Sequence, residues 1–423
     1  MAEESILTDD FLRELMNVGE VDILVGLRTY NDAGTVGQVV QAVRAGLLKH
    51  FPRQRSVIIN ADGGSRDGTQ DLVRAASISD MGRASGTQAL RTLHCISTQY
   101  EGGAAAVGNA LHAVLAAGDL LRASACAVVA ADSTSIEPEW LDRLLRPVLR
   151  DNFDLVTPLY RRHKFDGLLV RTLIYPMTRA LYGRRVREPY PAEFAFSGRL
   201  AGHLLAQDIW TQDVARAGAE MCLTVSAIAG GFRLEQSFLG EKPRTEHASA
   251  DLVPAMRQTV GTLFWMLDQN FAAWSAASNS EPVPAIGAEP ELTLEPLRVN
   301  RKRLHQLFVR GVSDLEPVLK TILTAPTLAA LQRIAGLPET EFCYPDELWA
   351  QTVYEFAASH HKTVISRDHI IQALAPLYRG KTHTFLAVNR DASGGEVEDN
   401  IEALCRCFEQ LKPYLLELWD GRK

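Results

Sequence analysis

The chain has 423 residues, of which 46% are hydrophobic and 22% charged, a balance that is ordinary for globular proteins. Its formal net charge of −7 gives no global attraction to nucleic acid or anionic membranes, so we expect neither as a partner. No run of 18 apolar residues occurs, which argues against a membrane span. The acidic start, MAEESILTDDFLREL, lacks a signal-peptide layout, and the cysteines lack zinc-ligand spacing, so we expect a cytoplasmic protein with reduced thiols.

The first 160 residues alternate between apolar runs that predict strands and periodic stretches that predict helices. A first helix is expected at 8–18, with Thr8 as its N-cap. We then expect strands at 21–27, 55–60, 90–96, 125–131 and 154–160, and helices at 35–50, 66–76, 104–118 and 137–150. This alternation predicts an α/β fold with a mostly parallel sheet, helices on both faces, and a ligand site at the carboxyl ends of the strands.

The remainder of the chain predicts mainly helices. We expect helices at 168–182, 208–218 and 251–274, and a short strand at 222–228. Pro, Ser, Ala and Glu dominate residues 276–296, a composition typical of a linker, and mostly helical periodicity follows it. The predicted organisation is therefore an α/β domain over residues 1–275, a linker over 276–296 and an all-α region over 297–423.

Two polar motifs follow the first two predicted strands. Tyr30, Asn31 and Asp32 could present amide groups to a nucleobase, although an ordinary turn that caps the next helix is the favoured interpretation of these residues alone. Asp62, in IINADGGSRDGTQD, could reach a ribose or a base edge, and a capped turn explains the same pattern equally well.

A third motif, VVAADSTS, places Asp132 directly after a buried strand. A nucleoside diphosphate needs a cation as it leaves, and Mg²⁺ or Mn²⁺ prefers hard oxygen ligands, so a carboxylate here fits a metal-assisted site. The competing interpretation is a helix cap ahead of Pro138.

The three motifs in this order resemble the nucleotide-sugar half of GT-A glycosyltransferases. The later segments LVTPLYRRHKFDG, YPMTRALYG, REPYPAEFAFSG and VARAGAEMCLTVSAIAGGFRLEQSFLG are similar to the retaining branch that contains glucosyl-3-phosphoglycerate synthase and mannosylglycerate synthase, over about residues 20–270. The resemblance implies a metal-dependent hexosyltransferase that uses UDP-glucose or GDP-mannose, a small polar or anionic acceptor such as glycerate or 3-phosphoglycerate, and retention. It also suggests a homodimer.

The resemblance also implies roles for single residues. Tyr30, Asn31 and Asp32 would lie along the base and ribose, and Asp62 would bind the nucleoside. Asp132 would lie at the donor ribose, sugar or metal. The remaining assignments are Glu193 near the transferred sugar, Glu220 facing sugar and acceptor as a polar contact or base, and His247 as a late metal ligand.

The chain departs from the family pattern at three places. Thr134 stands where the second Asp of the DxD metal motif is expected, and a hydroxyl is a far poorer ligand for a hard cation. Val107 stands in place of a lysine that would face the donor. The acceptor loop reads 167-GLLV-170 instead of Gly-Arg-x-Thr. The neighbouring basic residues Arg161, Arg162, His163, Lys164 and Arg171 could bind an anion or form a solvated loop.

Two alternatives to an active retaining transferase remain, and the departures motivate the first of them. One is a divergent nucleotide-sugar-binding homologue with weak or lost catalysis, and the other is an inverting transferase that acts on a polysaccharide or lipid. His360 and His361 are expected at the surface of a helix. The aromatic run from Phe264 to Trp274 is expected in the core or at a subunit contact.

Overall fold

The computed structural model describes residues 6–78, 94–99, 104–242, 252–287, 293–294 and 300–421. The chain forms two compact units. Unit 1 comprises residues 1–160, 190–243 and 283–289, and unit 2 comprises residues 161–189, 244–282 and 290–423. The units therefore do not follow the continuous ranges expected from the sequence, because the chain leaves unit 1 after residue 160 and returns to it twice.

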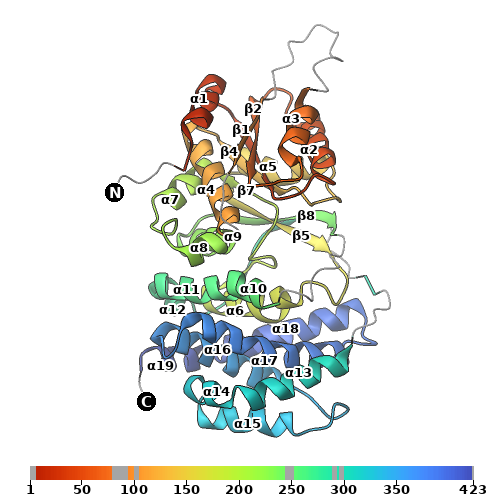
Figure 1. Cartoon of the computed structure of the whole chain (residues 1–423), viewed down its shortest axis with the longest axis vertical. Coiled ribbons are helices and arrows are strands. Elements are labelled where there is room, and N and C mark those ends of the chain that lie inside the picture. The colour runs from red at the N-terminus through yellow and green to blue at the C-terminus, as the bar shows by residue number, and fades with distance from the viewer. Residues whose placement is uncertain are drawn as a thin grey trace. The chain divides into compact units, whose positions relative to one another are not determined.

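Unit 1 is built on one large sheet whose order, over the described residues, is β10-β8-β5-β7-β4-β1-β2-β3 (Figure 1). Its strands are β1 (Ile23–Thr29), β2 (Ser56–Asp62), β3 (His94–Gln99), β4 (Ala125–Ala130), β5 (Leu155–Arg161), β7 (Phe194–Ser197), β8 (Leu234–Glu241) and β10 (Ala285–Ile286). β1 pairs in parallel with β2 and β4, and β2 with β3. β8 pairs in parallel with β10, and only β7 runs antiparallel to its neighbours, β4 and β5, among the strand pairings described. The predicted mostly parallel sheet is therefore confirmed.

Helices cover both faces of this sheet, as expected (Figure 1). They are α1 (Asp9–Val18), α2 (Val36–His50), α3 (Thr69–Ile78), α4 (Ala104–Leu120), α5 (Glu139–Asp151), α7 (Gly198–Leu205), α8 (Asp213–Ala217) and α9 (Ala219–Ala229). The Thr8 hydroxyl accepts a hydrogen bond from the Phe11 amide at 3.4 Å, which confirms the predicted cap of α1. The apolar side chains of β1, β4, α2 and α5 meet in one buried core.

Unit 2 is helical. Its elements are the π-helical turns η1 (Val170–Ile174) and η2 (Arg257–Gly261), the helices α6 (Tyr175–Tyr182), α10 (Leu252–Met256), α11 (Thr262–Gln269), α12 (Phe271–Ala276), α13 (Arg301–Asp314), α14 (Glu316–Ile322), α15 (Ala325–Ala335), α16 (Asp346–Lys362), α17 (Arg367–Val388), α18 (Gly394–Gln410) and α19 (Lys412–Trp419), and a two-stranded pairing of β6 (Arg184–Arg185) with β9 (Glu281–Pro282). The predicted C-terminal all-α region is confirmed. Among the helices that the structure describes, none has both the length and the apolarity to cross a bilayer.

Three sequence expectations about local structure are wrong. The strand expected at 222–228 is part of helix α9, because an apolar run buried on all sides gives the same pattern in a helix as in a strand. The single helix expected at 251–274 is divided into α10, η2, α11 and α12. The expected linker over 276–296 contributes strands β9 and β10, so part of it belongs to sheets.

His360 was expected at the surface, but its side chain is buried within α16. It is 2% exposed and its ring packs edge-on against Phe264 at 5.6 Å between ring centroids. Burial lowers the pKa of His360 to about 3, so the ring is neutral at physiological pH. His361 binds Asp268 with 2.6 Å between Nδ1 and Oδ1. Phe264 and Trp274 are buried as well, as expected for a core.

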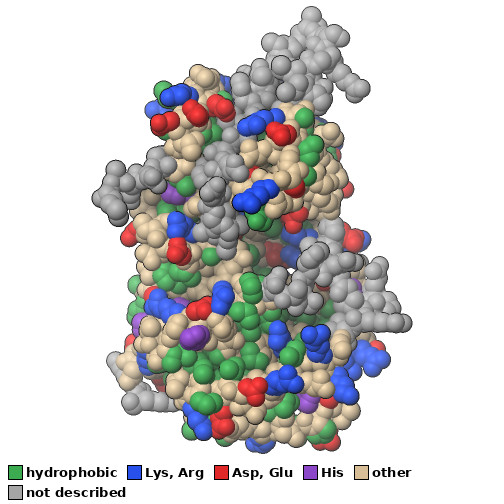
Figure 2. Space-filling view, in the orientation of Figure 1, with side chains coloured by type: hydrophobic (Ala, Val, Ile, Leu, Met, Phe, Trp, Pro, Cys, Tyr) green, Lys and Arg blue, Asp and Glu red, His purple; other side chains and the backbone are tan. Residues whose placement is uncertain are grey.

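Charged side chains are distributed unevenly over the surface. On the face drawn in Figure 2, acidic and basic side chains are interspersed over unit 1, while Lys and Arg side chains gather near α13 in unit 2. The first turn of α13 carries Arg301, Lys302 and Arg303 and no acidic residue, which is the sign that the helix dipole disfavours. This cluster is local, since the chain as a whole carries a net charge of −7.

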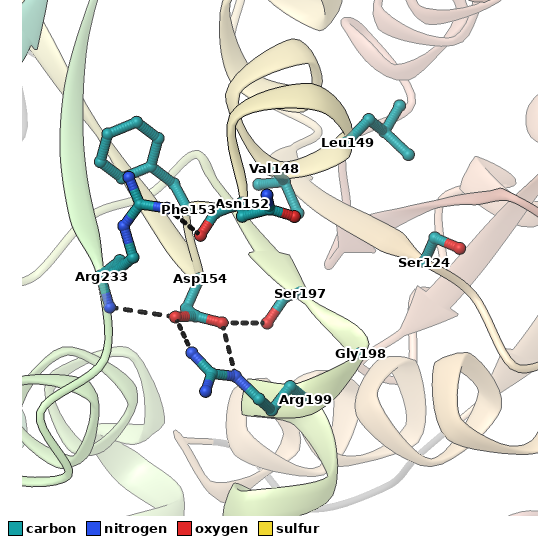
Figure 3. Close-up of a pocket in the computed structure, with 10 residues that line it drawn as sticks. All are labelled: Ser124, Val148, Leu149, Asn152, Phe153, Asp154, Ser197, Gly198, Arg199 and Arg233. Atoms are coloured by element: carbon teal, nitrogen blue, oxygen red, sulfur yellow. Dashed lines mark hydrogen bonds and ion pairs between the residues drawn. The ribbon is translucent and has the colours of Figure 1, made fainter.

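A cavity of about 520 Å³ lies at the edge of the sheet where β4, β5 and β8 begin (Figure 3). Asp154 is one of the residues that line it. This residue is 3% exposed, and its carboxylate accepts bonds from Ser197 Oγ at 2.8 Å, Arg199 Nε at 3.1 Å and the Arg233 amide at 3.0 Å. The Arg233 guanidinium donates to the Asp151 carbonyl at the end of α5 and lies over the Phe153 ring. Asp154 thus ties together the starts of β5, α7 and β8.

We expect Asp154→Asn to destabilise the protein by about 2 kcal/mol, because hydrogen bonds to a buried charge are lost. Burial favours a higher pKa for the Asp154 carboxyl, but Arg199, the Arg233 amide and Ser197 outweigh it and lower the pKa. A lowered pKa means that this stabilisation is present above pH about 4 and lost as the pH falls through the folded pKa. Urea denaturation between pH 3 and pH 7 measures both effects.

The exposed Asp10, which pairs with Arg13 on α1, provides the control. Asp10→Asn should leave the urea midpoint nearly unchanged, because exposed ion pairs contribute little. Equal midpoints for the Asp154 and Asp10 variants would show that the clamp at the cavity does not stabilise unit 1.

Candidate functional site

The polar residues of the three sequence motifs meet at the opposite edge of the sheet in unit 1. β1, β2 and β4 are parallel neighbours, so the segments after Thr29, Asp62 and Ala130 leave the sheet at the same edge. Antiparallel β7 begins at this edge, and Glu193 immediately precedes it. Ligands of open α/β sheets bind at such carboxyl ends. We therefore treat this edge as the candidate site.

Asp62 organises the turn after β2. Its carboxylate is fully buried and accepts bonds from Thr29 Oγ1 at 2.8 Å, the Gly64 and Ser65 amides at 3.0 and 2.7 Å, and Gln70 Nε2 at 3.1 Å. Burial favours a higher pKa, but the bonds from Ser65, Gln70 and Thr29 prevail and lower the pKa of Asp62, so it is ionised. Its oxygens are used inside the protein, and the direct nucleoside contact expected of Asp62 stays a prediction.

Glycines allow the backbone of this turn. Gly64 and Gly68 have φ of 94° and 88°, a region that side chains with a Cβ rarely adopt. This explains the spacing of DGGSRDGT as a requirement of backbone geometry.

The loops after β1 and β2 are joined by reciprocal hydrogen bonds. The Asn31 amide donates to Ser65 Oγ at 2.8 Å, and Asn31 Oδ1 accepts from the Arg66 amide at 3.0 Å. The Asp32 amide donates to Thr69 Oγ1 at 2.9 Å, while Asp67 accepts from the Ala33 amide at 3.0 Å. These hydrogen bonds join the first two sequence motifs into one rigid platform. The Asn31 side chain takes part in this platform through its bond with the Arg66 amide. Its expected contact with a base stays a prediction.

Two side chains of this platform are placed to meet a ligand. Tyr30 is 58% exposed, so its ring is available for stacking on a planar group. The Asp32 carboxylate accepts from the Tyr30 amide at 2.7 Å. Burial raises the pKa of Asp32 despite this bond, and the charges of Asp132 and Asp67 raise it further. The edge is therefore rich in negative charge, which favours ligand groups that donate hydrogen bonds and disfavours an uncompensated phosphate.

Asp132 and Thr134 lie exposed in the turn after β4. Within the described part of the chain, the Asp132 carboxylate has no hydrogen bond or ion pair, so it is free to bind a ligand. Ser133 between them points inward, and its hydroxyl donates to Glu193. The third motif thus presents one carboxylate and one hydroxyl outward, and anchors itself through Ser133.

Glu193 is the centre of a buried polar cluster. Its side chain accepts bonds from the Ser133 and Tyr160 hydroxyls and pairs with Lys242 Nζ at 3.2 Å. The Lys242 ammonium also lies 4.7 Å from the centroid of the Tyr160 ring. Burial favours a higher pKa for Glu193, but the charge of Lys242 and the two hydroxyls outweigh it and lower the pKa. Glu193 is therefore an ionised carboxylate with its bonding capacity largely used.

Glu220, the second residue of α9, forms a second buried pair with Arg28 of β1. The Arg28 guanidinium also donates to the Ala192 carbonyl at 3.0 Å, which holds the segment before Glu193. One oxygen of Glu220, Oε2, is buried without a hydrogen-bond partner among the described residues. Glu220 thus retains a free acceptor, whereas Glu193 is committed to its neighbours.

The described residues do not by themselves assemble a divalent-metal site. In the ranges that the structure describes, no three His, Cys, Asp or Glu side chains converge as ligands. Asp132 offers one free carboxylate, Thr134 replaces the second, and Glu193 and Glu220 are bound to cations. His247 lies outside the described residues.

Three of the basic residues that the sequence suggested for an anion site or a solvated loop, Lys164, Arg171 and Arg162, have partners within unit 2. Lys164 is 5% exposed and donates to two backbone carbonyls that precede α18. Arg171 pairs with Glu398 of α18 at 3.1 Å, and Arg162 pairs with Glu188 at 2.9 Å. These cations are used to hold unit 2 together.

Sequence reasoning missed three members of the site: Arg28, Tyr160 and Lys242. The only signal for Arg28 was a charged residue in an otherwise apolar strand, ILVGLRT. A cation buried in a strand requires an acid elsewhere in the chain, but the sequence does not indicate which one.

We expect Glu193→Ala to destabilise the protein by about 3 kcal/mol, because Lys242 loses its counter-charge in a largely buried position. Glu193→Gln should cost less, since it keeps an acceptor for Ser133 and Tyr160. Chemical denaturation measures both. Glu139→Ala, which removes an exposed partner of Lys49, is the matched control and should leave the midpoint unchanged. A Glu193→Ala midpoint equal to this control would contradict the network.

Comparison with known proteins gave structural similarity only. No family model matches the chain, and no curated protein matches it in sequence. Glucosyl-3-phosphoglycerate synthase from Mycobacterium tuberculosis, solved with Mn²⁺, uridine diphosphate and glucosyl-3-phosphoglycerate, matches 64% of this chain and 86% of its own at 18% identity, with a TM-score of 0.44. Mannosyl-3-phosphoglycerate synthase from Rubrobacter xylanophilus matches 62% of this chain and 77% of its own at 18% identity, with a TM-score of 0.41.

Proposed function

We propose that unit 1 binds a nucleotide sugar at the carboxyl edge of its sheet and transfers the hexose to a small polar acceptor. The observation that carries the proposal is the platform formed by the loops after β1 and β2, which presents Tyr30 and Asp32 at the edge where Asp132 is free. A stacking ring and carboxylates suit a nucleoside, which has a planar base and several hydrogen-bond donors.

The sequence motifs support the finer proposal. Their resemblance to the retaining GT-A branch favours UDP-glucose or GDP-mannose as donor, glycerate or 3-phosphoglycerate as acceptor, and retention of configuration. In this proposal Tyr30, Asn31 and Asp32 line the base and ribose, and Asp62 supports the nucleoside through the turn that it holds. Asp132 faces the donor.

The two buried acids take different parts in the proposed reaction. The bond between the anomeric carbon and the diphosphate oxygen breaks, a bond to the acceptor oxygen forms, and the acceptor hydroxyl loses its proton. Glu193 cannot readily accept that proton, because its oxygens already bind Ser133, Tyr160 and Lys242. Glu220 has a free oxygen and is the better candidate for a polar contact to sugar or acceptor, or for the base.

A divalent cation would supply charge neutralisation for the departing diphosphate when bound. We propose Asp132, with His247 as a late ligand, as the residues that would hold Mg²⁺ or Mn²⁺. Support for this part comes from the free Asp132 carboxylate and from the negative charge of the edge, which disfavours a diphosphate without a cation.

One observation favours a second candidate function, a nucleotide-sugar-binding protein with weak or lost catalysis. Thr134 stands where a second metal-binding carboxylate is expected. A protein of this kind would keep the platform for the nucleoside but would turn over little donor.

We expect the protein to release UDP from UDP-glucose or GDP from GDP-mannose when Mg²⁺ or Mn²⁺ and glycerate or 3-phosphoglycerate are present. A coupled assay for the free nucleotide measures turnover, and calorimetry measures donor binding. Donor binding without turnover under every combination would favour the second candidate. Absence of both binding and turnover would overturn the proposed function.

Asp132→Asn should lower donor turnover by about 100-fold or more, because the carboxylate that would hold the cation facing the departing diphosphate is lost. The variant keeps the shape of the side chain, so its unfolding midpoint should stay near that of the wild type. Asp119→Asn, a change in the last turn of α4, serves as the control. Turnover equal to that of the wild type would show that Asp132 has been assigned to the wrong place.

Thr134→Asp restores the second carboxylate and should tighten binding of Mn²⁺ by at least about tenfold, because carboxylates are better ligands for hard cations than hydroxyls. Titration of the apoprotein with Mn²⁺, followed by electron paramagnetic resonance, measures the affinity. Ser135→Asp, one residue further along the turn, is the matched control. Similar affinities for both variants would indicate that position 134 has no special relation to the metal.

A further inference from the structure

We propose that Arg28 is a positioning residue that holds Glu220 as an acceptor for a sugar hydroxyl, so that Arg28 determines recognition of the sugar and leaves recognition of the nucleotide unaffected. The identity of the ligand rests on the proposed function. The arrangement of Arg28 and Glu220 rests on the structure alone.

The Arg28 guanidinium connects three segments of unit 1. It projects from β1, its Nη1 contacts Glu220 Oε1 in the first turn of α9, and its Nη2 donates to the Ala192 carbonyl at 3.0 Å. The side chains of Arg28 and Glu220 are 14% and 2% exposed. A planar fork that binds a carboxylate on one side and a carbonyl on the other leaves little freedom to either group. Glu220 is therefore fixed relative to the segment that carries Glu193.

Nearby acids favour the charged form of Arg28. Burial lowers the pKa of Arg28, and the nearby Tyr190 hydroxyl and the carboxylates of Glu193 and Asp132 oppose that effect. Arginine retains its proton under such conditions because its ordinary pKa is above 12. Arg28 thus lies near acids both from α9 and from the strand ends. It is the only charged residue of β1.

Two polar atoms of the pair have no partner. Oε2 of Glu220 is a buried acceptor, and Nε of Arg28 is a buried donor, and neither is hydrogen bonded to a described residue. Buried polar atoms of this kind are costly unless a ligand or water satisfies them. The pair as a whole is neutral, so a phosphate gains little from it. A hydroxyl, which both donates and accepts, suits an acceptor and a donor in the same pair.

The competing explanation is that the pair only holds α9 against β1. Variants separate the two explanations. Arg28→Met removes the fork, Arg28→Lys keeps a charge without the fork, and Glu220→Gln keeps the shape of the acid. Arg28→Met combined with Glu220→Gln removes the lone buried charge that the first variant would leave. Arg143→Met is the matched control, because Arg143 also donates to a carbonyl of unit 1, that of Phe238, at 3.0 Å.

Affinities for UDP and for UDP-glucose, with the rate of UDP release, give the decisive comparison. We expect Arg28→Met to change the affinity for UDP by no more than about twofold and to lower kcat for UDP-glucose by at least about 100-fold. Arg28→Lys should recover part of that loss, and Arg143→Met should match the wild type. Equal losses for UDP and UDP-glucose, or no loss in the double variant, would overturn the proposal. GDP and GDP-mannose replace the uridine ligands if the wild type prefers them.

Thermal unfolding tests the pairing without reference to any ligand. Arg28→Met should lower Tm by several degrees, and the added Glu220→Gln change should recover much of that loss, because the unpaired buried carboxylate is gone. Additive effects of the two changes would overturn the pairing itself. Failure of the wild type to bind any nucleotide would reject the proposed function, while the Tm comparison would still decide whether Arg28 fixes Glu220.

Discussion

An ionised carboxylate removed from water must find hydrogen-bond donors or a cation, and this constraint determines the loops of unit 1. The Asp62 carboxylate accepts hydrogen bonds from the amides of its own turn and from the Thr29 hydroxyl. Glu193 gathers two hydroxyls and Lys242, and Asp154 ties three elements at the other edge of the sheet. Each acid can be buried because its hydrogen-bond donors or its cation compensate for the loss of water. The bonds to these partners hold the loop that carries the acid. The rigidity of the candidate site follows from these bonds.

The same constraint separates supporting residues from those that can meet a ligand. Asp62 and Glu193 use their oxygens internally, so they shape the edge. Tyr30 and Asp132 remain available, and Glu220 keeps one oxygen free. The site therefore combines a rigid, strongly acidic platform with a few open groups. Such an arrangement lets a protein bind a polar ligand without first reorganising its own side chains.

The sequence predicted that the candidate site lies at the carboxyl edge of the sheet. It did not predict which charged side chains pair with one another there. The strand-end positions of Asp32, Asp62 and Asp132 follow from local patterns, because a parallel sheet brings the ends of its strands together. The partners Arg28 with Glu220, and Glu193 with Lys242, are separated by long stretches of chain. No local pattern specifies which charge meets which acid across such distances, so these contacts could not be predicted.

The sequence by itself determined the alternation of strands and helices in the first 160 residues, the turn glycines and the helical character of the C-terminal region, because periodicity and backbone preference are local properties. Only the tertiary structure decided that residues 222–228 belong to helix α9, that the cations Lys164 and Arg171 have their partners in unit 2, and that Arg28 pairs with Glu220. A buried apolar run can form either a helix or a strand. A charged side chain can pair with many different partners. Packing selects among these options because burial without a partner costs more than any local preference contributes.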